Sequence, residues 1–192
     1  MKKSQSIFKS VSLSIAGLIL VSVVMVSCLK DSQNSTPPDA AGLMAFNLAT
    51  DKESVGISIG GNALISAPLA YTNYTGGYLG IYPGNRTVES FEFYSGASMA
   101  DTSESFTKDQ YYSVFVVGAA GNYRNIITWD NFDSLATDGS AYIRFINAIP
   151  DSISPTVLIS AYGNNIVNTQ AGFGKVSEFV ATVPGNITVD IN

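Results

Sequence analysis

The sequence predicts an all-β protein made of tandem antiparallel, immunoglobulin-like β-sandwiches, of which the second copy is incomplete. Three observations predict this fold class. The 192 residues include ten Tyr, ten Phe and seventeen Gly, a composition that favours strands and turns. Short segments of alternating apolar and polar residues recur with turn residues between them. Beyond the N-terminus no window shows a sustained helical period.

The N-terminal residues 1–27 are predicted to be a signal peptide. Lys2, Lys3 and Lys9 form its positive region, and residues 11–26 form its apolar core. This core spans sixteen residues, short of the roughly twenty that a membrane-spanning helix needs, so a cleaved signal is favoured over an uncut anchor.

Cys28 is the single cysteine of the chain and follows the apolar core directly. Its thiolate is a good nucleophile for lipid transfer, and Ser27 before it is small enough for a peptidase cleft. The run Met25-Val26-Ser27-Cys28 resembles the lipobox of bacterial lipoproteins, with Met25 where that family usually has Leu. The resemblance implies cleavage between Ser27 and Cys28 and a palmitate-type lipid on Cys28. An ordinary signal peptide followed by an incidental cysteine is the alternative.

Residues 28–41 are rich in Ser, Pro and Asn and lack an apolar period, which predicts a flexible tether. Lys30 and Asp31 loosely resemble the charged signal that sends some Gram-negative lipoproteins to the cell surface. We therefore expect a cell-envelope lipoprotein of the outer membrane, on its periplasmic or its cell-surface face, with the membrane as a partner through the lipid anchor.

From residue 42 onward the chain repeats itself. Residues 43–51 are echoed by residues 143–151, and residues 81–88 by residues 182–189, so the spacing of two separate blocks is kept to within one residue. This pattern predicts a first β-sandwich repeat at 42–138 and a second repeat at 140–192.

The strands are predicted in order along the two copies. Segments 54–60, 157–161 and 187–191 alternate in polarity, as half-buried strands do. Segment 87–94 places Glu89 and Phe91 on one face. Segment 111–118 is apolar on both faces apart from Ser113, which predicts a central strand. Turns are predicted where Pro-Gly-Asn occurs, at 83–85 and 184–186.

The second copy ends before any counterpart of residues 92–129. Three explanations stay open. The chain is part of a longer protein, its last strands pack onto the first copy, or a partner chain supplies the missing strands, as in donor-strand assembly.

The run AYIRFINAIPD at 141–151, the short V-x-I strand after it and VPGNITV at 183–189 together resemble the domain-of-unknown-function family 4397. In that family a copy opens near "N-A-x-P-D" and continues to "P-A-G-x-Y-x-V". The first copy has Thr50 in place of the proline, while DQYYSVFVVGAAGN at 109–122 resembles the family strand "Y-T-V-F-V-V-G". The resemblance covers the chain from about Gly42 and implies secreted or envelope-anchored β-domains without an established chemistry.

Charge and composition exclude several functions. The part from Cys28 onward carries seven basic and fifteen acidic residues, so nucleic acid is not expected as a partner. The chain has no histidine, which removes Ser-His and Cys-His nucleophiles and His-ligated metals. Glu89, Glu92 and Glu104 are candidate carboxylates by type alone. We expect no enzyme, no cofactor and no metal, although residues 51–53 and 130–133 come nearest to a calcium loop.

Aromatic residues give the best indication of binding. Tyr71, Tyr74 and Tyr78 lie with Tyr82 in YTNYTGGYLGIY, and Trp129 follows the predicted strand 124–128. Exposed rings stack on sugars or anchor protein interfaces, whereas buried rings fill a sandwich core, and both roles stay open here. The candidate binding surface is Tyr71, Tyr74, Tyr78 and Trp129.

Two Asp-Ser-aliphatic triplets resemble the acceptor of O-glycans in some Gram-negative envelope proteins, which makes Ser134 and Ser152 candidate glycosylation sites. Taken together, these patterns predict a non-catalytic module that binds or scaffolds glycan or envelope protein. The alternative is a fimbria-like structural subunit that assembles by strand exchange.

Overall fold

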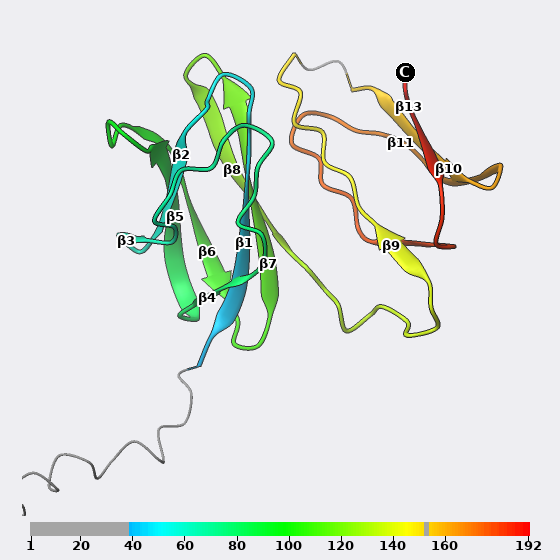
Figure 1. The fold of residues 1–192 in the computed structure, drawn as a ribbon, viewed down its shortest axis with the longest axis horizontal. Helices are drawn as coiled ribbons and strands as arrows, with labels where there is room; N and C mark the ends of the chain where they lie inside the picture. Colours follow the sequence, from blue (N-terminus) through cyan, green and yellow to red (C-terminus); the bar gives the residue numbers. More distant parts are fainter. Residues whose placement is uncertain (1–38, 152–153) are drawn as a thin grey trace, which may run out of the picture. The chain divides into compact units, whose positions relative to one another are not determined.

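The computed structural model describes residues 39–151 and 154–192, which form a unit of strands and connecting loops (Figure 1). The predicted all-β class and its sandwich architecture are confirmed. In the described residues, no helix has the length and apolar character needed to span a membrane. The predicted signal peptide and most of the predicted tether lie outside the described residues.

The first part of the unit is a sandwich of two four-stranded sheets. One sheet has the order β4-β1-β7-β8 and the other the order β3-β2-β5-β6 (Figure 1). The strands are β1 (Ala41–Ala49), β2 (Val55–Ile59), β3 (Asn62–Ala63), β4 (Leu79–Ile81), β5 (Gly84–Glu92), β6 (Ser98–Phe106), β7 (Tyr111–Ala119) and β8 (Asn122–Trp129).

Strand β7 is central, as its apolar faces predict, because it lies between β1 and β8. Its pairing with β1 is parallel, whereas the other strand pairs of the described chain are antiparallel. The core between the sheets consists of every second residue of β1 and the inward residues of β2, β5 and β7. Val88 and Val114 are fully buried there.

One side of this sandwich is closed by Asn125 of β8. Its amide Nδ2 donates to the carbonyl oxygens of Val88 and Ala100, each at 3.0 Å, and its Oδ1 accepts the Ser90 hydroxyl at 2.8 Å. These bonds cross from one sheet to the other. The opposite side, between the edge strands β3 and β4, has no such connection in the described hydrogen bonds.

The second part of the unit contains five strands in a three-stranded sheet β11-β10-β13 and a two-stranded sheet β12-β9. They are β9 (Ala141–Ile143), β10 (Thr156–Ala161), β11 (Asn164–Gln170), β12 (Val180–Thr182) and β13 (Ile187–Ile191).

Strand registers in the two parts correspond residue by residue. Ala41 lies opposite Ile81 in the β1–β4 pair, and Ala141 lies opposite Thr182 in the β9–β12 pair. Likewise Ile59 lies opposite Val88, and Ile159 lies opposite Val189. The same pairings therefore recur after shifts of 100 and 101 positions.

A buried asparagine organises one end of each part. Asn47 donates its Nδ2 to the carbonyls of Lys52 and Leu69 at 2.7 and 3.0 Å, and its Oδ1 accepts the Ala49 N–H at 3.1 Å. Asn147 donates to the Ala171 carbonyl at 2.7 Å and accepts the Ile149 N–H at 3.0 Å.

The environment of β13 differs from that of its counterpart β5. Val88 on β5 is fully buried, whereas the corresponding Val189 is 50% exposed. Ile187 and Ile191 are exposed as well. On this face β10 is covered, since Val157 and Ile159 pack against Ile143 and Phe145, but in the described residues no strand covers β13 as β7 and β8 cover β5.

We predict that Asn47→Ala lowers the free energy of unfolding by about 3 kcal/mol, because it leaves three backbone groups without their partner in a buried site. Urea unfolding followed by circular dichroism measures this loss. Asn85→Ala, at an exposed asparagine of β5, is the matched control and should change stability by less than about 0.5 kcal/mol. Equal losses in the two variants would contradict the role of Asn47.

Candidate functional site

Tyr71 and Tyr74 lie on the segment that runs beside β1, held there by backbone hydrogen bonds such as Thr75 N–H to Ala45 O at 3.0 Å. Tyr74 is 51% exposed and stacks on Phe46 with 5.4 Å between ring centroids. Phe46 in turn stacks on Phe115 of β7. The outer face of this sheet thus presents a stack of three rings with a tyrosine on top.

Tyr78 is half-buried, in contrast to Tyr74. Its hydroxyl donates to Oδ2 of Asp130 at 2.7 Å, and its ring lies edge-on to Tyr111 and Phe132. Burial, followed by this hydrogen bond to a carboxylate, raises the pKa of Tyr78 well above its ordinary value, so the phenol stays a donor. Trp129 is 47% exposed and donates its indole N–H to Gln110 at 2.8 Å.

The predicted aromatic residues therefore fall into separate groups of contacts. Tyr74 belongs to the stack on Phe46, Tyr78 to the surroundings of Asp130, and Trp129 to Gln110. Their role in binding stays a prediction, and Tyr78 has the least free surface of the four.

Asp130 is the most buried acid of the described chain, at 2% exposure. Besides Tyr78, the Ser113 hydroxyl donates to it at 2.7 Å, and Arg144 forms an ion pair with it. The guanidinium of Arg144 also lies 3.9 Å from the centroid of the Phe179 ring. This ion pair joins the end of β8 to the end of β9 and thus links the two parts of the unit.

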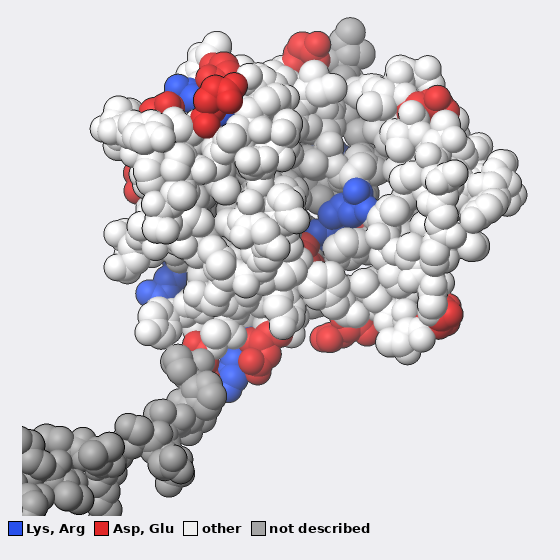
Figure 2. Space-filling view, viewed as in Figure 1, with Lys and Arg blue, Asp and Glu red and all other residues white. Residues whose placement is uncertain are grey.

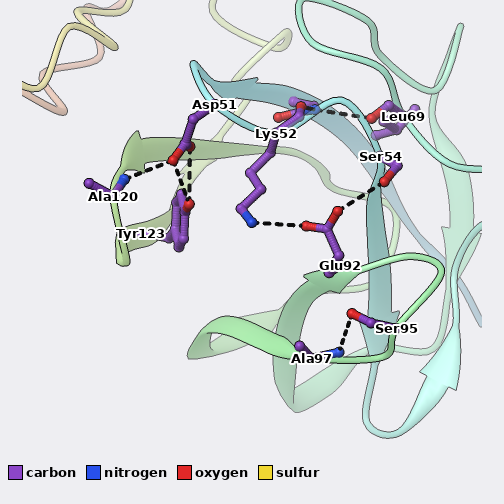
Figure 3. A network of polar contacts seen from close by, with 10 residues as sticks. Asp51, Lys52, Ser54, Leu69, Glu92, Ser95, Ala97, Ala120 and Tyr123 are labelled. Atoms are coloured by element: carbon purple, nitrogen blue, oxygen red, sulfur yellow. Dashed lines mark hydrogen bonds and ion pairs between the residues drawn. The ribbon is translucent and has the colours of Figure 1, made fainter.

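Three further charged side chains of the first sandwich, Asp51, Lys52 and Glu92, are held by polar contacts near one another (Figure 3). Asp51 accepts the Ala120 N–H at 2.9 Å and the Tyr123 hydroxyl, which ties the β1–β2 turn to the β7–β8 hairpin. Lys52 pairs with Glu92 at 3.1 Å, and Glu92 also accepts the Ser54 hydroxyl.

The candidate carboxylates Glu89 and Glu104 each accept a hydrogen bond from a nearby serine. Glu89 accepts the Ser58 hydroxyl at 3.4 Å, and Glu104 accepts the N–H of Ser105 at 2.9 Å. Within residues 39–151 and 154–192 no group of three acidic, His or Cys residues has the geometry to hold a metal ion.

A groove opens on the side of the first sandwich that Asn125 does not close. It has a volume of about 500 Å³ and lies between the β2–β3 hairpin and β4; we call it the first groove. Its lining includes Ile59, Asn62, Leu64, Leu79, Ile81, Tyr82 and Arg86. The Tyr82 ring is 67% exposed, and Arg86 is the only charged residue of the lining.

A second groove of about 440 Å³ occupies the corresponding place between the β10–β11 hairpin and β12. Its lining includes Ala161, Tyr162, Asn164, Ile166, Ala181, Thr182 and Val183. The hairpin turns also agree, since Gly60-Gly61 and Tyr162-Gly163 all have positive φ. At the mouth, Arg86 donates to the Pro83 carbonyl at 3.3 Å in the first groove, and the Tyr162 hydroxyl donates to Pro184 at 3.2 Å in the second.

Sequence reasoning did not find these grooves. The available signals were the asparagine that follows each hairpin turn, Asn62 and Asn164, and the positions of Tyr82 and Val183 after the matching strands β4 and β12.

Of the predicted modification sites, only Ser134 lies among the described residues. Ser134 is exposed and donates its hydroxyl to the Asn131 carbonyl at 3.1 Å. Ser152, Ser27 and Cys28 lie outside the described residues, so glycosylation and lipidation stay predictions.

Comparison with protein families gives one finding for this chain. The model of the family described as "Domain of unknown function (DUF4397)" matches residues 41–159, which comprise the whole first sandwich and the start of the second part. No curated protein matches the chain.

We predict that Arg144→Ala lowers the free energy of unfolding by about 3 kcal/mol, because it leaves the buried Asp130 carboxylate without its counter-charge. The measurement is urea unfolding, with Arg124→Ala as the control, since the guanidinium of Arg124 lies over the Phe173 ring and forms no ion pair in the described residues. The double variant Asp130→Asn/Arg144→Ala should recover part of the loss. A double variant as unstable as the sum of the single variants would contradict the pairing.

Asp51 provides a prediction about acid stability. The Ala120 N–H and then the Tyr123 hydroxyl hold the pKa of Asp51 below its ordinary value of 3.8, so the folded state favours the carboxylate. This contribution is complete above about pH 5 and is lost as the pH falls through the lowered pKa. Asp51→Asn should therefore shrink the difference between the urea midpoints at pH 7 and pH 3, and Asp101→Asn should not. An unchanged difference in Asp51→Asn would refute the assignment.

Proposed function

The chain belongs to the DUF4397 family, and from this premise we propose that it is a lipid-anchored cell-envelope protein whose tandem β-domains bind protein or glycan without catalysing a reaction. The proposal has three parts: the anchor, the tandem organisation and the binding role. Each part has support of its own.

The anchor is supported by the N-terminal sequence. A positive region, an apolar core and the run Met25-Val26-Ser27-Cys28 occur in the order that lipoprotein signals use. Lipidation of Cys28 would attach the β-domains to the outer membrane, with the Ser- and Pro-rich residues after Cys28 as a spacer. Two or more acyl chains give stable attachment, whereas one gives only marginal binding.

The tandem organisation is supported by the equal registers of β1–β4 with β9–β12 and of β2–β5 with β10–β13. The hydrogen bonds of Asn47 and Asn147 add support. So do the backbone bonds Thr72 N–H to Asn47 O, at 2.8 Å, and Gly174 N–H to Asn147 O, at 2.7 Å. Two unrelated segments would not be expected to share so many equivalent contacts.

The binding role is carried by one observation, the presence of a similar groove at the equivalent place in both parts. Concave, mostly apolar surfaces with a few polar groups are the usual form of binding sites. Few charged side chains interrupt the face of the molecule seen in Figure 2, so most of that face is uncharged. The exposed rings of Tyr74 and Tyr82 add the kind of side chain that anchors an interface.

A second candidate function is favoured by the exposed apolar residues of β13. Val189 and Ile191 are 50% and 60% exposed, although the residues at the same places on β5 are buried. Strands from another chain would bury them in a fimbria-like assembly. Size-exclusion chromatography and electron microscopy distinguish the two functions, since a structural subunit forms ladders or fibres and a binding module stays discrete.

The anchor makes a direct prediction. Cells expressing the full-length protein and fed radiolabelled palmitate should incorporate label into it, and the protein should fractionate with membranes. Cys28→Ala should lose the label and leave the membrane fraction. Ser32→Ala, four residues further on in the tether, is the matched control and should keep both properties. Membrane association that survives Cys28→Ala would refute the lipid anchor.

A further inference from the structure

We propose that the first groove binds an extended peptide segment that carries a carboxylate next to an aliphatic or aromatic side chain. This inference rests on the proposed binding function and names its site and the chemical class of the partner. Four features of the groove lead to it.

The walls of the groove favour peptide over sugar. Ile59, Leu64, Leu79 and Ile81 are aliphatic, and they offer no hydrogen bonds to the many hydroxyls of a glycan. Burying such hydroxyls without partners is unfavourable, whereas burying an aliphatic or aromatic side chain here is favourable. Tyr82 at the mouth adds an exposed ring that can cover such a side chain.

The groove lies where both sheets end in an edge strand, β3 on one side and β4 on the other. Gly42 of β1 donates its N–H to Gln110 O at 2.9 Å, on the side of β7, and Gly42 lies opposite Gly80 of β4. In an antiparallel pair, two residues that face each other without exchanging hydrogen bonds both direct their backbone groups outward. The N–H and C=O of Gly80 therefore point away from β1, toward the free edge, where an added strand can pair with them.

Gly80 itself suits the approach of another backbone. A Cβ built on it would meet no atom within 4 Å, so the space beside it is open. Glycine within a strand often marks a place where a ligand or a second backbone comes close.

Arg86 supplies the charge that selects the partner. It is the only charged residue of the lining, and its Nε is buried without a hydrogen-bond partner in the described part of the chain. Because Arg86 is only partly buried, a carboxylate on the bound segment would pair with its guanidinium through a charge-assisted hydrogen bond. Because acidic residues outnumber basic ones in this protein, a cationic groove also distinguishes the site from the rest of the surface.

The second groove has no charged residue that would select an acidic partner. Its lining contains no charged residue, and Tyr162 reaches across to the Pro184 carbonyl. It provides an internal control of similar volume at the equivalent place, with a different chemistry.

The test begins with a random peptide library displayed on phage and selected on the full-length protein. Enriched sequences should share an Asp or Glu beside an aliphatic or aromatic residue. Fluorescein-labelled synthetic versions should bind in anisotropy titrations, and versions N-methylated along the backbone should not.

The variants then place the site. Asn62→Trp fills the first groove, and Arg86→Gln removes its charge, and each should raise the Kd at least tenfold. Asn164→Trp, the same change in the second groove, and Lys108→Gln, which removes an exposed positive charge elsewhere, should leave the Kd within twofold. Thermal unfolding shows which variants fold. If Asn62→Trp does not fold, the binding measured for Arg86→Gln decides the test.

Three outcomes would overturn the inference. The first is that no peptide family is enriched. The second is that enriched peptides bind the folded Asn62→Trp or Arg86→Gln protein as tightly as the unaltered protein. The third is that a panel of bacterial and plant polysaccharides binds in the groove instead. The third outcome would leave the proposed binding function intact, whereas failure of peptides and polysaccharides alike would count against both.

Discussion

One buried amide group in each part of the molecule is the constraint on which the rest of the structure depends. The Asn47 side chain lies between the β1–β2 turn and the segment 64–78, which connects β3 to β4. It forms hydrogen bonds with backbone groups of both. That segment bonds to Val55 at Leu69 and to Ala45 at Thr75, so it crosses from one sheet to the other. A buried backbone group without a partner is costly, and one asparagine removes that cost at three places. The segment then leads into β4, so the position of the first groove follows from Asn47.

Much of the fold could be predicted because strand alternation is a local property. Segment 54–60 contains β2, and segment 111–118 forms β7 with its central place in the sheet. The parallel pairing of β1 with β7 could not be predicted in this way, because alternation does not report the direction of a neighbour. Strand β3 is two residues long and carries too little pattern to be recognised.

The candidate site was harder to predict because its properties arise between residues far apart in the chain. Tyr74 and Tyr78 are four positions apart and similar in sequence context, yet the second is half-buried because Asp130 and Arg144 complete its surroundings. The first groove likewise exists only because β3 and β4, which are sixteen residues apart in sequence, both end their sheets. Nothing in the sequence marks Arg86 as a groove residue, because its place in the lining becomes visible only in three dimensions.

The hairpin at Tyr162 shows how the two parts have diverged. Tyr162 has a φ of 50°, a conformation that costs an ordinary side chain about 1 kcal/mol and that Gly60 adopts without strain at the matching place. Its ring lies so close to Gly185 that a Cβ there would come within 2.2 Å of the Tyr162 oxygen. Tyr162 and Gly185 therefore restrict each other. A side chain at position 185 would require a change at Tyr162, which couples the β10–β11 hairpin to the turn that precedes β13.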